Sequence, residues 1–382
     1  MELHDILCTM IGKGATDLHI KVGSPPGMRI DGDIVLISDC EPLLAGQVEA
    51  MLREILTPQK WEIFSREGDL DAGYSVPGLA RFRVSALKQR GACAMVIRRI
   101  SSEAPTLTSL KLPEMIRDFC DRKCGLIIMA GPIGSGKSTT LAAMINQINE
   151  TRVGHILTLE DPIEFIHPDK KCIITQREIG SDSRDFHTAL TRALRQDPDV
   201  ILVGDLSDVE TISLSLTAVE TGRLVLGTVN SSLVSQAVDK LLAEFPREQR
   251  PQRRTQLSSA LVGVVTQTLV ATVDGGRIPA PEVLVVNEDV RDCIRDGNTF
   301  RLESILTSGS EPTTVTLEDS LIRLAKEGVI SSATAISKAK RPEIVEKALN
   351  SVTSDSDSNA DLLNKGKETG PDERFIGLSV NL

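Results

Sequence analysis

The feature that most constrains the fold is a glycine-rich segment at residues 131–138, which lies between an apolar run and a helical pattern. Its sequence, GPIGSGKS, matches the pattern GxxxxGK followed by Ser or Thr. The run before it, GLIIMAG, predicts a buried strand, and STTLAAMINQINE after it predicts a helix. A strand, a glycine-rich loop and a helix in this order are typical of parallel α/β folds that bind phosphate groups. The fold class predicted for this part of the chain is therefore α/β.

The residue types in this segment suit the recognition of a triphosphate. Glycines let backbone N–H groups turn inward around a phosphate, and the amino end of the following helix adds partial positive charge. Lysine at this position reaches the β- and γ-phosphates, and the serine hydroxyl after it suits a hydrated Mg²⁺. The alternative is a glycine turn followed by a chance lysine. We predict ATP and Mg²⁺ as cofactors, bound by Gly131, Gly134, Ser135, Gly136, Lys137, Ser138 and Thr139.

Acidic side chains follow two further apolar runs that are predicted to be strands. HILTLEDPIEF supplies Glu160, Asp161 and Glu164, and DVILVGDLSD supplies Asp205 and Asp208. Because the carboxyl ends of parallel strands converge on the phosphate loop, carboxylates there can hold hydrated Mg²⁺ or orient an attacking water. Acidic residues also cap helices, and this second role is favoured for Asp208. The functional role is favoured for Glu164 and Asp205.

Changes of pattern along the chain indicate its domain organisation. Residues 1–102 alternate short apolar runs with turns, which predicts a small α+β domain. Residues 103–113 are rich in Ser, Thr and Pro and are predicted to be a linker. Residues 114–350 alternate strand and helix patterns and end in amphipathic segments, which predicts a parallel sheet covered by helices. Residues 351–382 are polar and are predicted to be mostly disordered.

The composition excludes several classes of partner. The 382 residues carry 43 basic and 53 acidic side chains and few aromatics (eight Phe, one Trp and one Tyr), which argues against nucleic-acid binding. No apolar run approaches the ~20 residues of a membrane span, and the amino end lacks a signal-peptide pattern. A cytoplasmic protein without direct membrane insertion is expected. Residues 76–100 nevertheless hold six basic side chains and no acidic one, which suits a small anion.

Several long motifs occur together and in one order. They are GPIGSGKSTT, ILTLEDPIEF, ALRQDPDVILVGDLSDVETI, LTAVETGRLVLGTVNSS and AEFPREQRPQRRTQLSSALVGVVTQ, preceded by GATDLHIKVGSPPGMRIDGDIV and ARFRVSALKQRGACAMVIRRI. With these motifs the chain resembles the PilT/PilU twitching-motility ATPases of the type II/IV secretion ATPase superfamily. The similarity covers roughly residues 1–330.

The resemblance implies a PAS-like N-terminal domain, a RecA-like P-loop ATPase domain and a ring-shaped homo-hexamer in which ATP faces the N-terminal domain of a neighbouring subunit. Lys137 and Ser138 correspond to the Walker A pair. Glu164 takes the place of the general base or water-orienting group. Asp205 takes the place of the Walker B carboxylate, which holds Mg²⁺ through water.

Two arginines complete the implied catalytic set. Arg83 in RFRVS and Arg98 in VIRRI match the arginines that reach the nucleotide phosphates in this family. An arginine near the γ-phosphate offsets charge that develops in the transition state. Taken without the motifs, arginines on alternating strands more often form a solvated face.

The function implied is that of an ATP-hydrolysing motor of type IV pilus retraction. Its partners would be an inner-membrane platform protein of the pilus and a paralogous retraction ATPase, and its location peripheral, at the inner face of the cytoplasmic membrane.

Four positions depart from the family pattern: Asp205 in place of Glu, Ser207 in place of Arg, Arg223 in place of His, and Asn230 in place of His. Asp205 keeps the charge with a reach shorter by roughly 1.5 Å, and Asn230 cannot become cationic. A catalytically weakened paralogue that assists an active motor is therefore the alternative hypothesis. A pilus-extension or secretion ATPase ranks lower, because that subgroup carries a longer N-terminal region and a four-cysteine zinc module.

Overall fold

The computed structural model describes residues 2–30, 32–38, 40–100, 104–308 and 314–350. The prediction of disorder for residues 351–382 lies outside the described residues, as does the first residue of the predicted linker. Among the described residues, no helix is long and apolar enough to cross a membrane.

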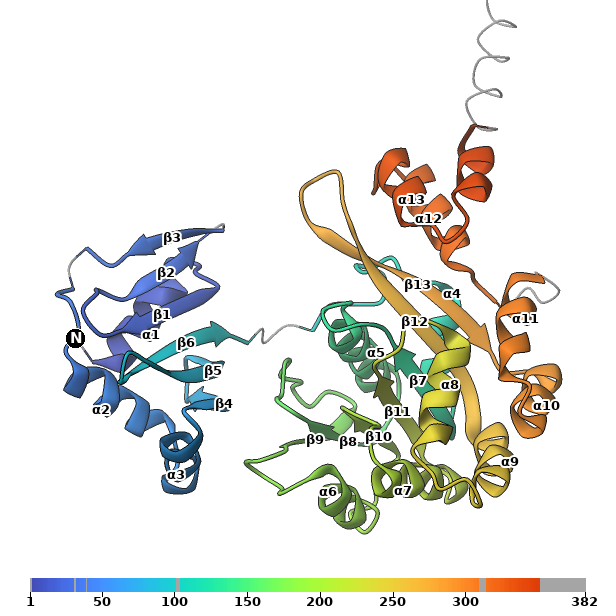
Figure 1. Cartoon of the computed structure of the whole chain (residues 1–382), viewed down its shortest axis with the longest axis horizontal. Coiled ribbons are helices and arrows are strands. Elements are labelled where there is room, and N and C mark those ends of the chain that lie inside the picture. The colour runs from blue at the N-terminus through green and yellow to red at the C-terminus, as the bar shows by residue number, and fades with distance from the viewer. Residues whose placement is uncertain (1, 31, 39, 101–103, 309–313, 351–382) are drawn as a thin grey trace, which may run out of the picture.

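The N-terminal unit is an antiparallel sheet with helices packed on one face (Figure 1). The strand order is β3-β2-β1-β6-β5-β4. Its elements are α1 (Leu3–Gly12), β1 (Asp17–Lys21), β2 (Gly27–Ile30), β3 (Asp33–Leu36), α2 (Ala45–Ile55), α3 (Pro58–Glu67), β4 (Asp69–Val76), β5 (Ala80–Gln89) and β6 (Ala92–Arg99).

Alternation along β5 explains the two faces of this sheet. Phe82, Val84 and Ala86 are buried and join the core beneath α1, α2 and α3. Arg83 lies between them in sequence and therefore faces the opposite side, because successive side chains of a strand alternate. The open face of the sheet thus carries the arginine that the sequence singled out.

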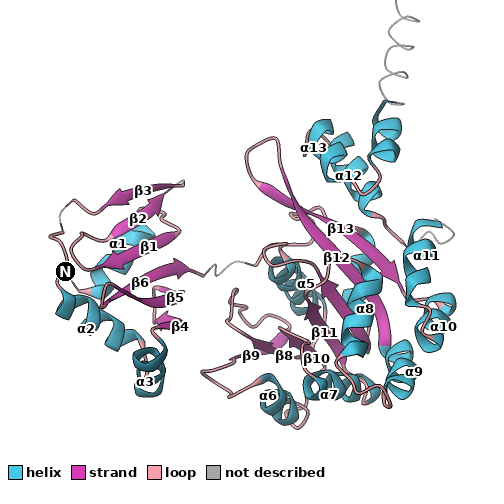
Figure 2. Ribbon diagram, in the orientation of Figure 1, coloured by secondary structure: helices cyan, strands magenta, loops and turns pink. Residues whose placement is uncertain are grey.

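The second unit is built on a mixed sheet in the order β13-β12-β7-β11-β10-β8-β9, parallel except for the β12–β13 pair (Figure 2). The prediction of a parallel sheet covered by helices is confirmed. The elements are α4 (Glu114–Cys120), β7 (Gly125–Ala130), α5 (Lys137–Thr151), β8 (Gly154–Glu160), β9 (Cys172–Glu178), α6 (Phe186–Ala193), β10 (Val200–Val203), α7 (Val209–Glu220), β11 (Leu224–Val229), α8 (Val234–Ala243), α9 (Arg250–Ala260), β12 (Leu261–Ala271), β13 (Arg277–Val285), α10 (Glu288–Asp296), a 3₁₀ turn (Thr299–Arg301), α11 (Leu302–Ser308), α12 (Leu317–Lys326) and α13 (Ser332–Lys338).

Strand β7 lies in the interior of this sheet, between β12 and β11, and is buried on both faces. Ile127 and Met129 pack with α4 and α5, whereas Leu126 and Ile128 pack with α6, α7, α8 and α9. An unbroken apolar run is what a doubly covered parallel strand requires. The loop after β7 is consequently attached to a strand in which every residue is buried.

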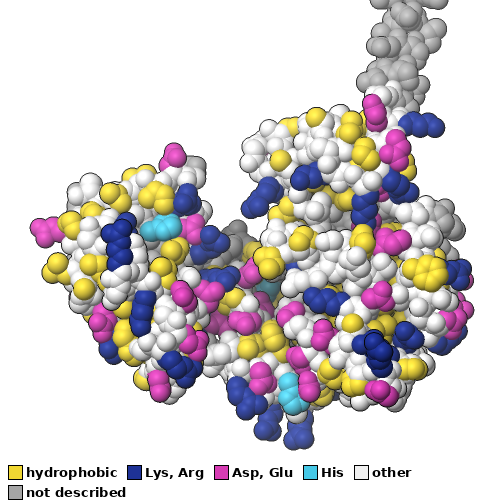
Figure 3. Space-filling view, in the orientation of Figure 1, with side chains coloured by type: hydrophobic (Ala, Val, Ile, Leu, Met, Phe, Trp, Pro, Cys, Tyr) yellow, Lys and Arg dark blue, Asp and Glu magenta, His cyan; other side chains and the backbone are white. Residues whose placement is uncertain are grey.

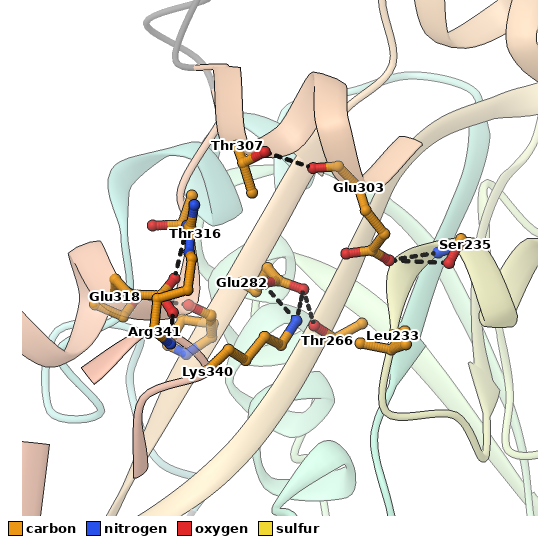
Figure 4. A network of polar contacts seen from close by, with 12 residues as sticks. Leu233, Ser235, Thr266, Glu282, Glu303, Thr307, Thr316, Glu318, Lys340 and Arg341 are labelled. Carbon is orange, nitrogen blue, oxygen red and sulfur yellow. Dashed lines mark hydrogen bonds and ion pairs between the residues drawn. The ribbon is translucent and has the colours of Figure 1, made fainter. Parts of the chain in front are cut away.

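The C-terminal helices are fastened to the β12–β13 hairpin by apolar packing and by buried ion pairs (Figure 4). The Lys340 ammonium lies 2.9 and 3.0 Å from the two carboxylate oxygens of Glu282 on β13, whose side chain is 4% exposed. Thr266 on β12 donates a further hydrogen bond to Glu282. Arg341 and Glu318 form a second pair beside it. The helices are thus anchored to β13, which pairs with β12, the neighbour of β7.

Replacing Lys340 by Ala tests this anchor. Burial already raises the pKa of Glu282, and losing the opposing cation raises it further. A raised folded-state pKa means that the ionised carboxylate costs stability above that pKa, and that protonation at lower pH removes the cost. We expect Lys340→Ala to lower the free energy of unfolding by about 2 kcal/mol at pH 8 and by less at pH 5. Thermal unfolding at both pH values measures this, with exposed Lys338→Ala as the control; an equal loss at both would contradict it.

Candidate functional site

The glycine loop between β7 and α5 has the backbone shape of a phosphate cradle. Gly131, Gly134 and Gly136 have φ values of 153°, 78° and 87°, which side chains rarely allow. A Cβ at Gly131 would lie 2.4 Å from Ser135 Oγ and 2.8 Å from a backbone carbonyl oxygen. The Ser135 hydroxyl is buried and has no partner among the described residues, so a donor and acceptor inside the loop is left for a ligand. The predicted phosphate loop therefore has the required geometry.

Gln267 on β12 holds this loop from beneath. Its side-chain amide donates to the Ser135 carbonyl at 2.8 Å and accepts from the Thr140 hydroxyl of α5 at 2.8 Å. Gln267 is 4% exposed, so both bonds form away from water. No functional motif in the sequence pointed to Gln267. The signal that could have found it is a polar pair inside an otherwise apolar strand, VVTQTLV.

The Lys137 ammonium folds back over the loop. It donates to the carbonyl oxygens of Gly131 at 2.8 Å and Pro132 at 3.0 Å, and to Asn230 Oδ1 at 3.1 Å. Asn230 follows β11, the strand next to β7. The residue that departs from the family histidine is thus a direct partner of the loop lysine.

Two of the predicted carboxylates share the electrostatic field of Lys137. Burial lowers the pKa of the Lys137 ammonium, whereas the negative charges of Asp205 and Glu164 raise it. Asp205 follows β10 and Glu164 follows β8, so both lie at the carboxyl edge of the sheet, as predicted. Glu164 also lines a pocket with Ser138, the predicted Mg²⁺ ligand. The fold therefore brings together the lysine, the serine and the two carboxylates.

The inner wall of that pocket is less charged than its composition suggests. Burial raises the pKa of Glu160, which accepts hydrogen bonds from Thr158 at 2.6 Å and Gln176 at 3.2 Å. Burial and the nearby Lys170 lower the pKa of His167 to about 4, so its imidazole is neutral at physiological pH. The exposed Glu164 and Asp161 are thus the pocket carboxylates that meet solvent water.

Asp208 caps the amino end of α7, which is the role that its sequence position favoured. Its side chain accepts from the Thr211 backbone N–H at 2.7 Å and begins α7. This contact satisfies one of the free donors at the helix amino end.

The two predicted arginines are cross-strand neighbours on the open face of the N-terminal sheet. Arg83 on β5 pairs in register with Arg98 on β6. Arg83 donates to Asp71 at 2.8 Å, and Arg98, 68% exposed, donates to Asp17 at 2.7 Å. Neither arginine is among the described residues that line the pocket. Arg83 nevertheless lowers the pKa of Asp161 in the acidic loop, although burial and Glu178 raise that pKa overall.

The four departures from the family pattern do not lie together. Asp205 and Asn230 stand at the carboxyl edge of the sheet, beside Lys137. Arg223 precedes β11 and therefore lies at the opposite edge, where its guanidinium donates to the Thr221 and Pro198 carbonyl oxygens. The exposed Ser207 adjoins the cap of α7. Arg223 is therefore separated from the phosphate loop, because parallel strands place their amino ends and their carboxyl ends at opposite edges of the sheet.

Comparison with known proteins agrees with this geometry. The family described as "Type II/IV secretion system protein" matches residues 75–277. The chain belongs to this family. The type IV pilus retraction ATPase PilT of Pseudomonas aeruginosa is 40% identical over 343 residues, covering 90% of this chain and 99% of that protein. The type IV pilus ATPase PilU of the same organism is 38% identical over 340 residues, covering 89% of each chain.

A solved structure gives the same result for the fold. The crystal structure of the pilus retraction motor PilT with bound ADP matches with a TM-score of 0.81 and 36% identity, covering 91% of this chain and 99% of that chain. The second unit therefore has the RecA-like ATPase fold of this family.

The support from Gln267 leads to a prediction for nucleotide binding. Gln267→Ala leaves the Ser135 carbonyl and the Thr140 hydroxyl without their partner and loosens the loop. We expect ADP to bind about tenfold more weakly, the equivalent of one lost buried hydrogen bond. Calorimetric titration of the full chain measures this. The exposed Gln252→Ala on α9 is the matched control, and equal affinity of both variants would contradict the assigned role of Gln267.

Proposed function

We propose that this protein is an ATP-hydrolysing motor of type IV pilus retraction. The observation that carries the proposal is the shared electrostatic field of Lys137, Glu164 and Asp205 above a glycine loop with an unpartnered Ser135 hydroxyl. The similarity to PilT and PilU, each described as a pilus ATPase, supports the pilus as the machine that is driven.

The residues present fit a nucleotide with Mg²⁺. The loop N–H groups and the amino end of α5 suit the phosphates, and the Ser138 hydroxyl and Asp205 carboxylate are the hard oxygen donors that Mg²⁺ prefers. Bound Mg²⁺ would neutralise part of the phosphate charge. Lys137 would exchange its carbonyl partners for phosphate oxygens.

Hydrolysis then needs a positioned water and compensation of charge. Glu164 orients the water and accepts its proton as the water oxygen bonds to the γ-phosphorus and the bond to the β–γ bridging oxygen breaks. Lys137 and the arginines Arg83 and Arg98 offset the negative charge that moves onto the phosphate oxygens. Asp205, shorter than the family glutamate, reduces turnover, since a displacement of about 1 Å can cost ~100-fold in rate.

The assembly and partners follow from the same proposal. Six copies form a ring, which acts at the inner face of the cytoplasmic membrane through a pilus platform protein and works beside a paralogous retraction ATPase.

Lys137→Ala tests hydrolysis directly. The variant loses the phosphate-facing cation, and we expect phosphate release from ATP with Mg²⁺ to fall at least ~100-fold. Lys123→Ala, an exposed lysine before β7, is the control and keeps the parent rate. Turnover in the parent no higher than in Lys137→Ala would refute the motor function.

The departures give a second test. Asp205→Glu restores the longer carboxylate, and we expect the turnover number to rise about tenfold, with a further rise when Asn230→His is added. Arg223→His restores a family residue at the far edge of the sheet and serves as the matched control. Steady-state kinetics compare the variants. If Arg223→His raised the turnover number as much as Asp205→Glu does, the effect would not depend on distance from the phosphate loop, and this would contradict the proposal.

A further inference from the structure

Glu178, at the end of β9, is a buried carboxylate that joins the two units of the chain. Its side chain is 3% exposed. It accepts hydrogen bonds from the Arg81 guanidinium on β5 and from the Gly73 backbone N–H on β4 at 3.2 Å. The Lys60 ammonium of α3 lies 4.0 Å from it. β4 and β9 are far apart in sequence and face one another in the fold, and charged side chains follow the surface where the units meet (Figures 1 and 3).

The fit at this junction leaves no room for a side chain at Gly73. A Cβ there would lie 2.6 Å from Glu178 Oε2 and 2.7 Å from Arg81 Nη2. Gly73 does not have a positive φ, so its backbone tolerates alanine. The close approach of the carboxylate is therefore what requires glycine.

Glu178 also binds the acidic loop that lines the pocket. The Ile163 backbone N–H donates to Glu178 Oε2 at 3.4 Å, and Ile163 lies between Pro162 and Glu164, both in the pocket wall. The Glu178 carboxylate thus accepts hydrogen bonds both from the N-terminal sheet and from the backbone of the acidic loop.

The consequence concerns Arg83. Gly73 and Arg83 are register partners on β4 and β5, so whatever fixes Gly73 fixes the backbone of Arg83. The Arg83 guanidinium donates to Asp71 at 2.8 Å; burial raises the pKa of Asp161 in the acidic loop, and the positive charge of Arg83 opposes that rise. These contacts are made by the chain's own N-terminal unit, whereas the family resemblance implies the N-terminal domain of a neighbouring subunit.

We infer that Glu178 and Arg81 are positioning residues that lock the N-terminal sheet onto the acidic loop and so present Arg83 to the γ-phosphate of ATP in the same chain. The inference rests on the proposed function, because it takes the phosphate loop to bind ATP. Glu178 and Arg81 lie outside the phosphate loop and are distinct from the arginines Arg83 and Arg98. The close approach at Gly73 adds a steric requirement for glycine.

The first test is structural and needs no activity. Amide hydrogen exchange is measured on the full chain for peptides containing Gly73 and Ile163. Gly73→Ala and Arg81→Gln should each speed exchange about tenfold in both peptides, since the junction opens more often. Gly46→Ala, on α2 of the same unit with open space around its Cβ, is the control and should leave exchange unchanged. Unchanged exchange in Gly73→Ala and Arg81→Gln would overturn the junction.

The second test separates positioning from mere stability. Affinities for ATPγS and for ADP, both with Mg²⁺, are measured for Arg81→Gln, Arg83→Ala and the double variant. Arg81→Gln and Arg83→Ala should each reduce the preference for ATPγS about fivefold, and the double variant should show no further loss, because Arg81 acts through Arg83. Losses that multiply, or no loss in either single variant, would overturn the positioning role. Neither measurement requires turnover, so failure of the proposed hydrolysis would appear only in the phosphate-release assay.

Discussion

The phosphate loop keeps its shape because three glycines with positive φ are held against Gln267 by two buried hydrogen bonds. Everything else in the nucleotide site is placed relative to that loop. β7, an interior strand with apolar packing on both faces, carries the loop, and α5 begins directly after it with its amino end at the loop. Because β12 supplies Gln267 and also carries Thr266, the loop and the anchor of the C-terminal helices share one strand.

Parallel topology explains why residues far apart in sequence form one site. The loop lysine follows β7, Asn230 follows β11, Asp205 follows β10 and Glu164 follows β8. Because parallel strands end at the same edge of the sheet, the charges of Lys137, Asp205 and Glu164 interact, and Asn230 accepts a hydrogen bond from Lys137. The same rule separates Arg223 from them, since it stands where β11 begins. The sheet therefore places Asp205 and Asn230 beside the loop lysine and Arg223 at the opposite edge.

Local sequence predicts what depends on neighbours in the chain. The strand–loop–helix unit, the alternation of β5 and β6 and the cap at Asp208 are all local patterns, and the structure agrees with each. Gln267, Glu178 and the remoteness of Arg223 depend on contacts between segments that lie far apart. Glu178 in particular ends a polar strand with no local signal, and its donors Gly73 and Arg81 are about a hundred residues away. No periodicity in one segment encodes such a meeting.

Asn230 has a consequence for how the phosphate loop responds to acidity. A histidine beside Lys137 would gain charge near neutral pH and repel the ammonium, whereas the Asn230 amide remains an acceptor at every physiological pH. His167, the imidazole in the pocket wall, has a pKa of about 4 and is also neutral in that range. Between pH 5 and 8 neither position changes the charge around the lysine. The hydrogen bond between Lys137 and Asn230 is therefore kept across that range without a change of charge on its acceptor.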